Sequence, residues 1–127
     1  MSTSSILMST LSTPNTIASF LGLAIGSALG APVYGFKEGH IRQLLEGEVT
    51  GYVDPVTAFP DKPNKWRSRA LYAGAAQQAL AIADVLAIYG EADVAALADL
   101  YVRLATAPLR DTTSSVGALR MPGHFFR

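Results

Sequence analysis

The chain has 127 residues, of which 50% are hydrophobic and 16% are charged, with ten basic and ten acidic residues and no net charge. A chain of this length forms one domain, and soluble domains usually carry about 25% charged residues. Because these charges are too few to coat a small globule, we expect an apolar face to be buried against more protein or lipid. The absence of a basic patch excludes electrostatic binding of nucleic acid. The absence of cysteine excludes disulfides and thiolate metal sites.

The N-terminal part predicts a leader followed by a long helix. Residues 1–13 are rich in Ser and Thr without periodicity, which is typical of a disordered segment. Thr13-Pro14 is a helix-start signal, because a hydroxyl cap precedes a proline at the first helical position. The helix that follows, to about Leu29, is apolar on nearly all sides, which predicts a central position. Gly30-Ala31-Pro32 ends it, since Pro disfavours helical backbone in the residue before it.

This helix also raises the question of a membrane span, because the first charged residue is Lys37. The apolar run from Ile17 to Val33 is shorter than the ~20 residues that a bilayer span needs, and no positively charged start precedes it as in a secretory signal. Gly22, Gly26 and Gly30 form a ridge of the kind used for close helix packing, in membranes and in soluble bundles. We therefore expect a buried helix of a cytoplasmic protein. A small membrane-associated helical protein is the alternative.

The middle of the chain predicts less regular structure. Gly39 to Glu46 has the apolar spacing of a short amphipathic helix, closed by Gly47. Glu48 to Val53 is expected to be briefly extended. Asp54 to Asn64 contains three prolines and is expected to form a loop without regular structure, either as an ordinary connection or as a flap over a substrate.

Two further helices are predicted in the second half. Leu71 to Tyr89 is apolar and alanine-rich and is stopped by Gly90. Asp93 to Thr106 has a capping aspartate and an apolar stripe, and Pro108 closes it. No alternating strand series is present. The sequence therefore predicts an all-α fold, with a core made by the first long helix and the helix at 71–89.

Two stretches resemble a known family. Gly22 to Tyr34 reads GLAIGSALGAPVY, and Leu71 to Leu80 reads LYAGAAQQAL. They resemble the ADP-ribosylglycohydrolase family, whose patterns are Gly-Asp-Ala-Leu-Gly-Ala-Pro-Val-Glu and Leu-Tyr-(Ser/Thr)-Asp-Asp-Thr-Gln-Gln-Ala-Leu. The resemblance implies a compact helical bundle over residues 14–127 that corresponds to the N-terminal part of a hydrolase domain.

The same resemblance implies an enzyme with two magnesium ions that cleaves ADP-ribose from an acceptor such as an arginine or serine side chain. Magnesium requires hard oxygen ligands and polarises the attacking water. Here Ala73, Gly74 and Ala75 occupy the family's ligand positions, and Ser27 and Tyr34 occupy its acidic positions. In the family, further carboxylates come from a part of the chain that is distant from these two stretches. The sequence up to Arg127 contains no counterpart of that part. We therefore expect no metal, cofactor or catalytic residue in this chain, which would make it a truncated pseudoenzyme with a degenerate site.

Other acidic and histidine side chains offer no replacement site. Six acids are expected on solvated faces: Glu38, Glu46, Glu48, Glu91, Asp93 and Asp99. Asp84 lies mid-helix among apolar residues, and a cap or a salt bridge with an arginine is favoured there over a buried functional carboxylate. His40 and His124 share no metal-ligand spacing and are expected at the surface.

Three functions are compatible with these observations. The leading hypothesis is a non-catalytic member of the family that binds or assembles through its apolar helix faces, by self-association or with a second polypeptide. The second is one half of a metal-dependent hydrolase completed by another chain. The third is the membrane-associated protein named above. Whether the chain is an enzyme stays open at this point, because the family resemblance and the missing ligands point in opposite directions.

Overall fold

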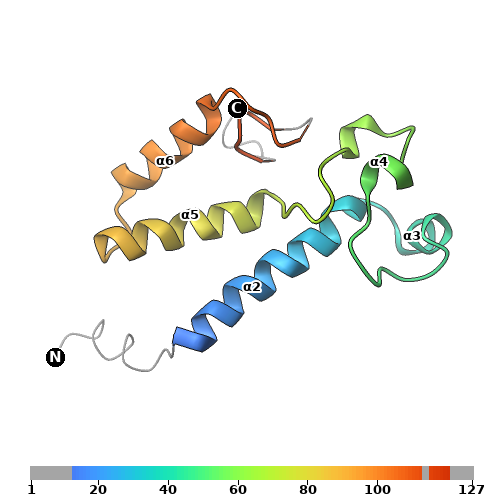
Figure 1. The fold of residues 1–127 in the computed structure, drawn as a ribbon, viewed down its shortest axis with the longest axis horizontal. Helices are drawn as coiled ribbons and strands as arrows, with labels where there is room; N and C mark the ends of the chain where they lie inside the picture. Colours follow the sequence, from blue (N-terminus) through green and yellow to red (C-terminus); the bar gives the residue numbers. More distant parts are fainter. Residues whose placement is uncertain (1–12, 113–114, 121–127) are drawn as a thin grey trace.

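The computed structural model describes residues 13–112 and 115–120 (Figure 1). Within them, five α-helices and two short 3-10 helices follow one another, and the only β-structure consists of two isolated bridges. The predicted all-α fold is confirmed. Of the predicted leader, residues 1–12 lie outside the described part of the chain, whereas Thr13 already belongs to the first described helix.

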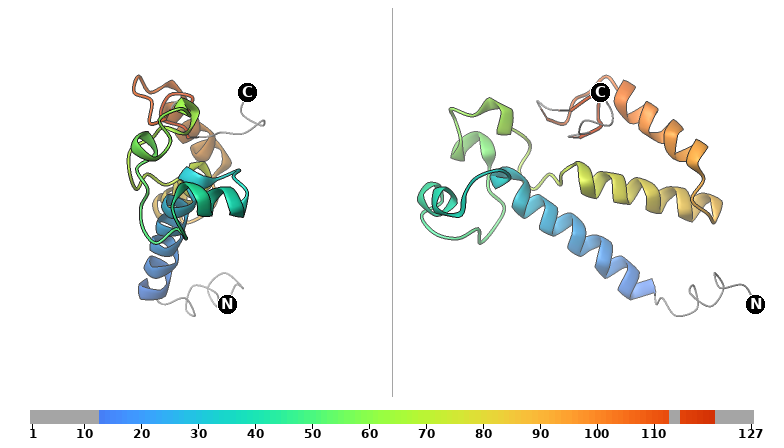
Figure 2. Two further views of the ribbon diagram at one scale, coloured as in Figure 1. Left: turned by 90° about the vertical axis from the view of Figure 1, so that its right-hand side faces the viewer. Right: turned by 180° about the vertical axis from the view of Figure 1, so that it is seen from behind.

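The long helices form a zigzag rather than a closed bundle. Helix α2 (Thr13–Gly30) continues into the 3-10 helix η1 (Ala31–Val33). Helix α5 (Gly74–Tyr89) packs on the C-terminal part of α2, and α6 (Val94–Thr106) packs back on α5. Figures 1 and 2 show that α2 and α5 converge at one end and diverge at the other, so the N-terminal end of α2 projects from the body.

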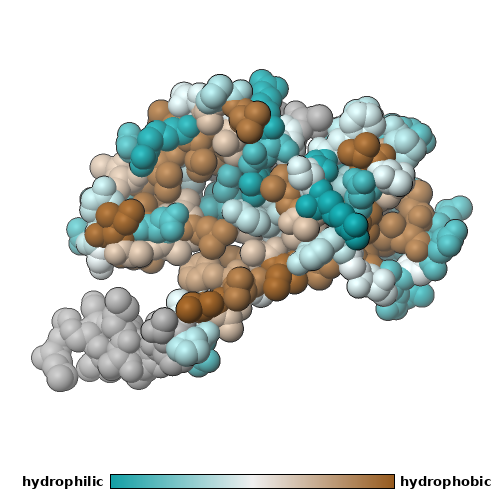
Figure 3. Space-filling model, viewed as in Figure 1, coloured by the Kyte–Doolittle hydropathy of each residue, from teal (hydrophilic) through white to brown (hydrophobic). Residues whose placement is uncertain are grey.

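The expectation that α2 is a central helix is wrong for the described structure. Among residues 14–30 only Ala28 is buried, while Ile17 and Leu21 are 55% and 57% exposed. Figure 3 shows the resulting apolar band along α2. An all-round apolar sequence makes a helix suited to burial, but here no described element covers the diverging end. The buried apolar residues lie instead near the C-terminal end of α2, in the segments that follow it, and on α5. They are Ala28, Ala31, Val33, Phe59, Ala76, Ala81, Val85 and Leu119.

The length argument against a membrane span also needs correction. Together with η1, the helix gives a continuous stretch of 20 residues, Pro14–Val33, that is long and apolar enough to cross a membrane and is only 22% buried. Core helices of soluble proteins and signal sequences share these properties. The helix is therefore compatible with a membrane span, but its length and composition do not indicate one.

The proline-rich connection is more regular than predicted. Helix α3 (Glu38–Leu44) lies within two residues of its predicted bounds, and residues 48–53 form no strand. Within the predicted loop, however, α4 (Pro55–Ala58) and the 3-10 helix η2 (Pro63–Lys65) are present. Both begin with proline, whose fixed φ and missing N–H suit the first helical position. The Asp54 side chain caps α4 by accepting the Val56 N–H at 3.2 Å.

The ends of the two later helices follow their sequence signals. Gly90 closes α5 in the left-handed conformation, at a φ of 74°. Asp93 caps α6 by accepting the Ala96 N–H at 2.8 Å. Helix α5 begins at Gly74, three residues later than predicted, and the cap position before it is held by Ala73, which makes no side-chain hydrogen bond.

After α6, the described part of the chain folds back over the start of α5. We call residues 107–112 and 115–120 the C-terminal segment (Figure 1). One bridge pairs Thr112 with Arg67. At the other end Gly117, at a φ of +57°, lies directly against the end of α6, where the Ala118 N–H donates to the Leu104 carbonyl at 2.7 Å.

Candidate functional site

The two family-like stretches meet in space at the start of α5. The Ser27 hydroxyl, near the C-terminal end of α2, accepts a hydrogen bond from the Ala73 N–H at 2.8 Å. These residues are 46 positions apart in the sequence. The fold thus brings together the two stretches that resemble the family patterns.

The side chains at this junction do not fit a magnesium centre. Ala73 and Ala75 present methyl groups and Gly74 presents none, so Ser27 supplies the one side-chain oxygen, a neutral hydroxyl that already accepts an N–H. The first turn of α5 contains no acidic residue. Since the N-terminal end of a helix carries partial positive charge, a dication placed there would be repelled. Magnesium chemistry therefore has no support from these residues.

Tyr34, at the other acidic position, lies elsewhere in a cationic environment. Its side chain is 69% exposed. Its carbonyl accepts a hydrogen bond from the Lys65 ammonium, which also lies over the Phe36 ring, 4.8 Å from the centroid. Burial, and then the neighbouring cations Arg67 and Lys62, lower the pKa of Lys65. Such an environment is unsuited to a divalent cation.

A polar network that sequence reasoning missed covers the first half of α5. The buried Gln77 amide donates to the Ala118 carbonyl and accepts the Arg120 N–H, both at 2.8 Å. The Arg120 guanidinium donates to the Asp111 carboxylate at 2.7 Å and to the Tyr72 carbonyl at 3.1 Å, and it stacks over the Tyr72 ring. In the sequence, Gln77 was used only as one residue of the family-like stretch. A glutamine on an otherwise apolar helix could have indicated the network, because a buried amide requires hydrogen-bond partners.

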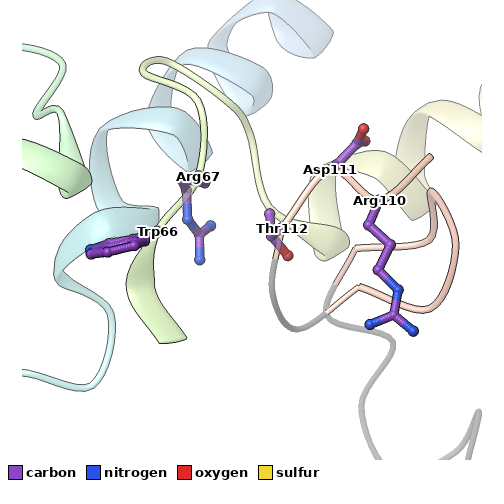
Figure 4. Close-up of a pocket in the computed structure, with 5 residues that line it drawn as sticks. All are labelled: Trp66, Arg67, Arg110, Asp111 and Thr112. Atoms are coloured by element: carbon purple, nitrogen blue, oxygen red, sulfur yellow. The ribbon is translucent and has the colours of Figure 1, made fainter. Parts of the chain in front are cut away.

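Next to this network lies an open pocket of about 520 Å³. Its described lining comes from the segment after η2 and from the C-terminal segment: Trp66, Arg67, Arg110, Asp111 and Thr112 (Figure 4). The Arg67–Thr112 bridge holds the two segments together. Arg67 is only 8% exposed, and burial, followed by the nearby Arg120, lowers its pKa.

The remaining candidate residues lie mostly at the surface. Five of the six acids are exposed, namely Glu38, Glu46, Glu48, Glu91 and Asp99, and the sixth, Asp93, caps α6. The interpretation of Asp84 is wrong, because it is exposed and forms no ion pair within the described residues. His40 is exposed, whereas His124 lies outside the described residues. Within the described ranges, no group of three or more His, Asp or Glu side chains could hold a metal ion.

Comparison with protein-family models identifies one family. The model described as ADP-ribosylglycohydrolase matches residues 11–124. Comparisons with curated proteins and with solved structures give no match. The family match covers most of the chain, including both stretches that meet at Ser27 and Ala73, and it agrees with the all-α fold. The chain belongs to the ADP-ribosylglycohydrolase family.

Proposed function

We propose that this chain is a member of the family without hydrolytic activity, which acts by binding and assembly. The observation that carries the proposal is the hydrogen bond between Ser27 and Ala73. It joins the two family-like stretches, which supports the proposal that the site is assembled but lacks side-chain ligands for a metal. The Ser27 hydroxyl has a structural role there, because it accepts a hydrogen bond from the backbone N–H of Ala73.

The chemistry of the family supports the proposal that these substitutions abolish hydrolysis. Two-metal hydrolysis places both ions together, one to activate water and one to stabilise the leaving group. Its ligands act as a unit, so their losses are not additive. Ala73, Gly74 and Ala75 provide no oxygen through their side chains, and restoring part of one ligand group does not restore the pair of ions.

Release of free ADP-ribose tests this part of the proposal. Arginine- and serine-linked ADP-ribosyl substrates are incubated with the chain and Mg²⁺, and the products are separated by chromatography. We expect no release, either from the chain or from the triple variant Ala73→Thr, Gly74→Asp, Ala75→Asp, which rebuilds one ligand group. Turnover by the unchanged chain would overturn the non-catalytic assignment. Turnover by the triple variant alone would show that one rebuilt group is sufficient.

The assembly part of the proposal rests on the outward side of α2. Ile17, Leu21 and Ile25 are each about half exposed, and the helix carries no charged residue. Burying one such side chain stabilises a complex by about 1.5–3 kcal/mol, so a face of several favours a protein partner over water. Side chains added at Gly22 and Gly26 would meet nothing within 4 Å, which leaves room for a closely packed helix. The proposed partner is a second copy of the chain or a different polypeptide.

Sedimentation with paired variants tests the α2 face. Leu21→Lys puts a charge on the proposed face, whereas Val102→Lys makes the same kind of change at an exposed position of α6. We expect Leu21→Lys to weaken association about tenfold or more, because a buried unpaired charge is strongly unfavourable, and Val102→Lys to leave it unchanged. Equal effects of both variants, or a stable monomer that binds no hydrophobic dye, would contradict the proposal. Flotation of the unchanged chain with neutral lipid vesicles would favour the membrane-associated alternative.

A further inference from the structure

The exposed face of helix α2 has a shape that complements itself. Side chains four positions apart on a helix form a row along its surface. Two neighbouring rows of α2 are exposed: the apolar row, Ile17, Leu21 and Ile25, and the small row, Ala18, Gly22 and Gly26. We propose that two copies of the chain pair through α2, with the apolar row of each helix lying against the small row of the other. The pairing rests on the proposed function, in which this face binds a partner, and makes that partner a second copy.

The small row is an unfilled groove beside the apolar row (Figure 3). Side chains added at Gly22 and Gly26 would meet nothing within 4 Å. Glycine inside a helix is destabilising relative to alanine, and the contacts of residues 13–112 and 115–120 do not require its small size at these two positions. A second helix lying in the groove would require it, because small residues let two helix backbones approach closely.

A second copy is favoured over a different polypeptide because ridge and groove lie side by side on one helix. A two-fold dimer uses the same patch on both subunits, so that patch must complement itself. Rows of residues four apart that interdigitate from both helices give the commonest packing of two helices in globular proteins. The apolar row supplies the ridge and the small row supplies the groove, so each copy provides what the other needs.

The charges and polar groups of α2 also suit a pairing with itself. The first charged side chain of the sequence is Lys37, so two copies of α2 meet without like-charge repulsion, and α2 offers no charge that would select a different partner. The Ser19 hydroxyl donates to the Asn15 carbonyl at 2.9 Å, and the Ser27 hydroxyl accepts the Ala73 N–H at 2.8 Å. Pairing therefore desolvates no serine hydroxyl that lacks a partner on this helix.

Disulfide trapping tests the pairing, because the chain contains no cysteine. Gly22 is the middle residue of the small row, so it faces its own counterpart whichever way the two helices run. At a close crossing, the Cα atoms come within the range of about 4.4–6.8 Å that a disulfide needs. Under mild oxidation we expect Gly22→Cys to form a covalent dimer about tenfold faster than Val102→Cys, which places the thiol at an exposed position of α6.

Filling the groove separates pairing from helix stability. Gly22→Leu occupies the small row, so the dimer measured by sedimentation equilibrium should weaken about tenfold or more, although leucine favours the helix more than glycine does. Gly39→Leu makes the same change at an exposed glycine of α3 and should leave the dimer unchanged. Equal effects of the two leucine variants, or equal trapping of the two cysteine variants, would overturn the pairing.

A further outcome separates the pairing from the proposed function. A monomeric chain whose binding of a hydrophobic dye is lost in Leu21→Lys would overturn the pairing alone, since the face would still be available to a different polypeptide. A monomeric chain that binds no dye would overturn both the pairing and the assembly role of α2. Flotation of a monomeric chain with neutral lipid vesicles would replace the second copy by lipid.

Discussion

Helices α2 and α5 are built from similar residues but are buried to very different extents. Neither has a charged residue in its first or last turn, and both are strongly apolar. Yet α5 buries five residues, spread from Gly74 to Val85, whereas α2 buries only Ala28 among residues 14–30. Apolar composition alone therefore does not decide which helix becomes part of the core.

The difference lies in the directed polar contacts that hold other segments against α5. Gln77 binds the C-terminal segment through both ends of its amide. On α2, the Ser27 hydroxyl accepts one N–H at the junction with α5. A hydrogen-bonded anchor fixes where a covering segment lies, whereas an apolar face alone attracts any apolar surface. The same contrast supports the proposal that the exposed face of α2 binds a partner.

Removing the anchor on α5 should have the largest effect. In Gln77→Ala, the Ala118 carbonyl and the Arg120 N–H lose their partners in a part-buried site, so the free energy of unfolding should fall by about 2–4 kcal/mol. The matched control is Gln78→Ala, because the structure gives the Gln78 side chain no hydrogen bond within the described residues. Urea unfolding measures both variants. Equal losses would show that the amide of Gln77 is not a specific anchor.

Displacing the C-terminal segment from α6 should cost somewhat less. A Cβ added at Gly117 would lie 2.4 Å from the Ala105 carbonyl oxygen, at a φ of +57°. We expect Gly117→Ala to lower the free energy of unfolding by about 1–3 kcal/mol, from strain and displacement of the segment. Gly39→Ala is the control, because it lies in α3 in open space and should be neutral or stabilising. Thermal unfolding of the two variants in parallel decides the point; a neutral Gly117→Ala contradicts the close packing.

Supplying the missing cap of α5 should be stabilising. Ala73 holds the N-cap position without a side-chain hydrogen bond. Ala73→Ser introduces an acceptor for the first turn, and we expect a gain of about 1 kcal/mol in the free energy of unfolding. The opposite effect is expected for Ser27→Ala at the same junction. This change removes the acceptor of the Ala73 N–H and should lower the free energy of unfolding by about 1 kcal/mol. A loss in Ala73→Ser would mean that the start of α5 differs from the geometry described.

The smallest effect concerns Tyr101 on α6. Burial raises its pKa above the ordinary value of 10.0. Because the folded state favours the neutral phenol, its contribution to stability is intact below pH 10 and is lost as the pH rises above 10 through the higher pKa of the folded state. The difference between the ultraviolet titrations of the unchanged chain and of Tyr101→Phe isolates this group. Its midpoint should lie above 10.0, and a midpoint at or below that value would contradict burial of the phenol.

Much of the fold was predictable from local sequence signals, and the errors of the prediction have physical causes. Asp93 and Gly90 marked helix ends correctly because caps act through the nearest backbone groups. The prediction of an irregular loop for the proline-rich segment was wrong, because Pro55 and Pro63 begin helical turns and do not interrupt them. The central position predicted for α2 was wrong because periodicity states which residues prefer burial and not whether a segment is present to cover them.

The candidate site was predictable only in part. The family resemblance assigned Ser27 and Ala73 to two separate motifs, and their hydrogen bond was found only in the structure. The network of Gln77 and Arg120, and the pocket beside Trp66, depend on contacts over more than 40 residues of sequence. No spacing rule reports such contacts, because they arise from the way the C-terminal segment folds back.

We propose that the fold brings Ser27 and Ala73 together without supplying metal ligands at this junction. Calorimetric titration of the chain with Mn²⁺ and with Mg²⁺ tests it most directly, with Ser27→Ala as a comparison. We predict heats of dilution alone, identical for the chain and the variant, since one neutral hydroxyl at the positive end of a helix does not hold a dication. A saturable site of micromolar affinity that disappears in Ser27→Ala would contradict the account.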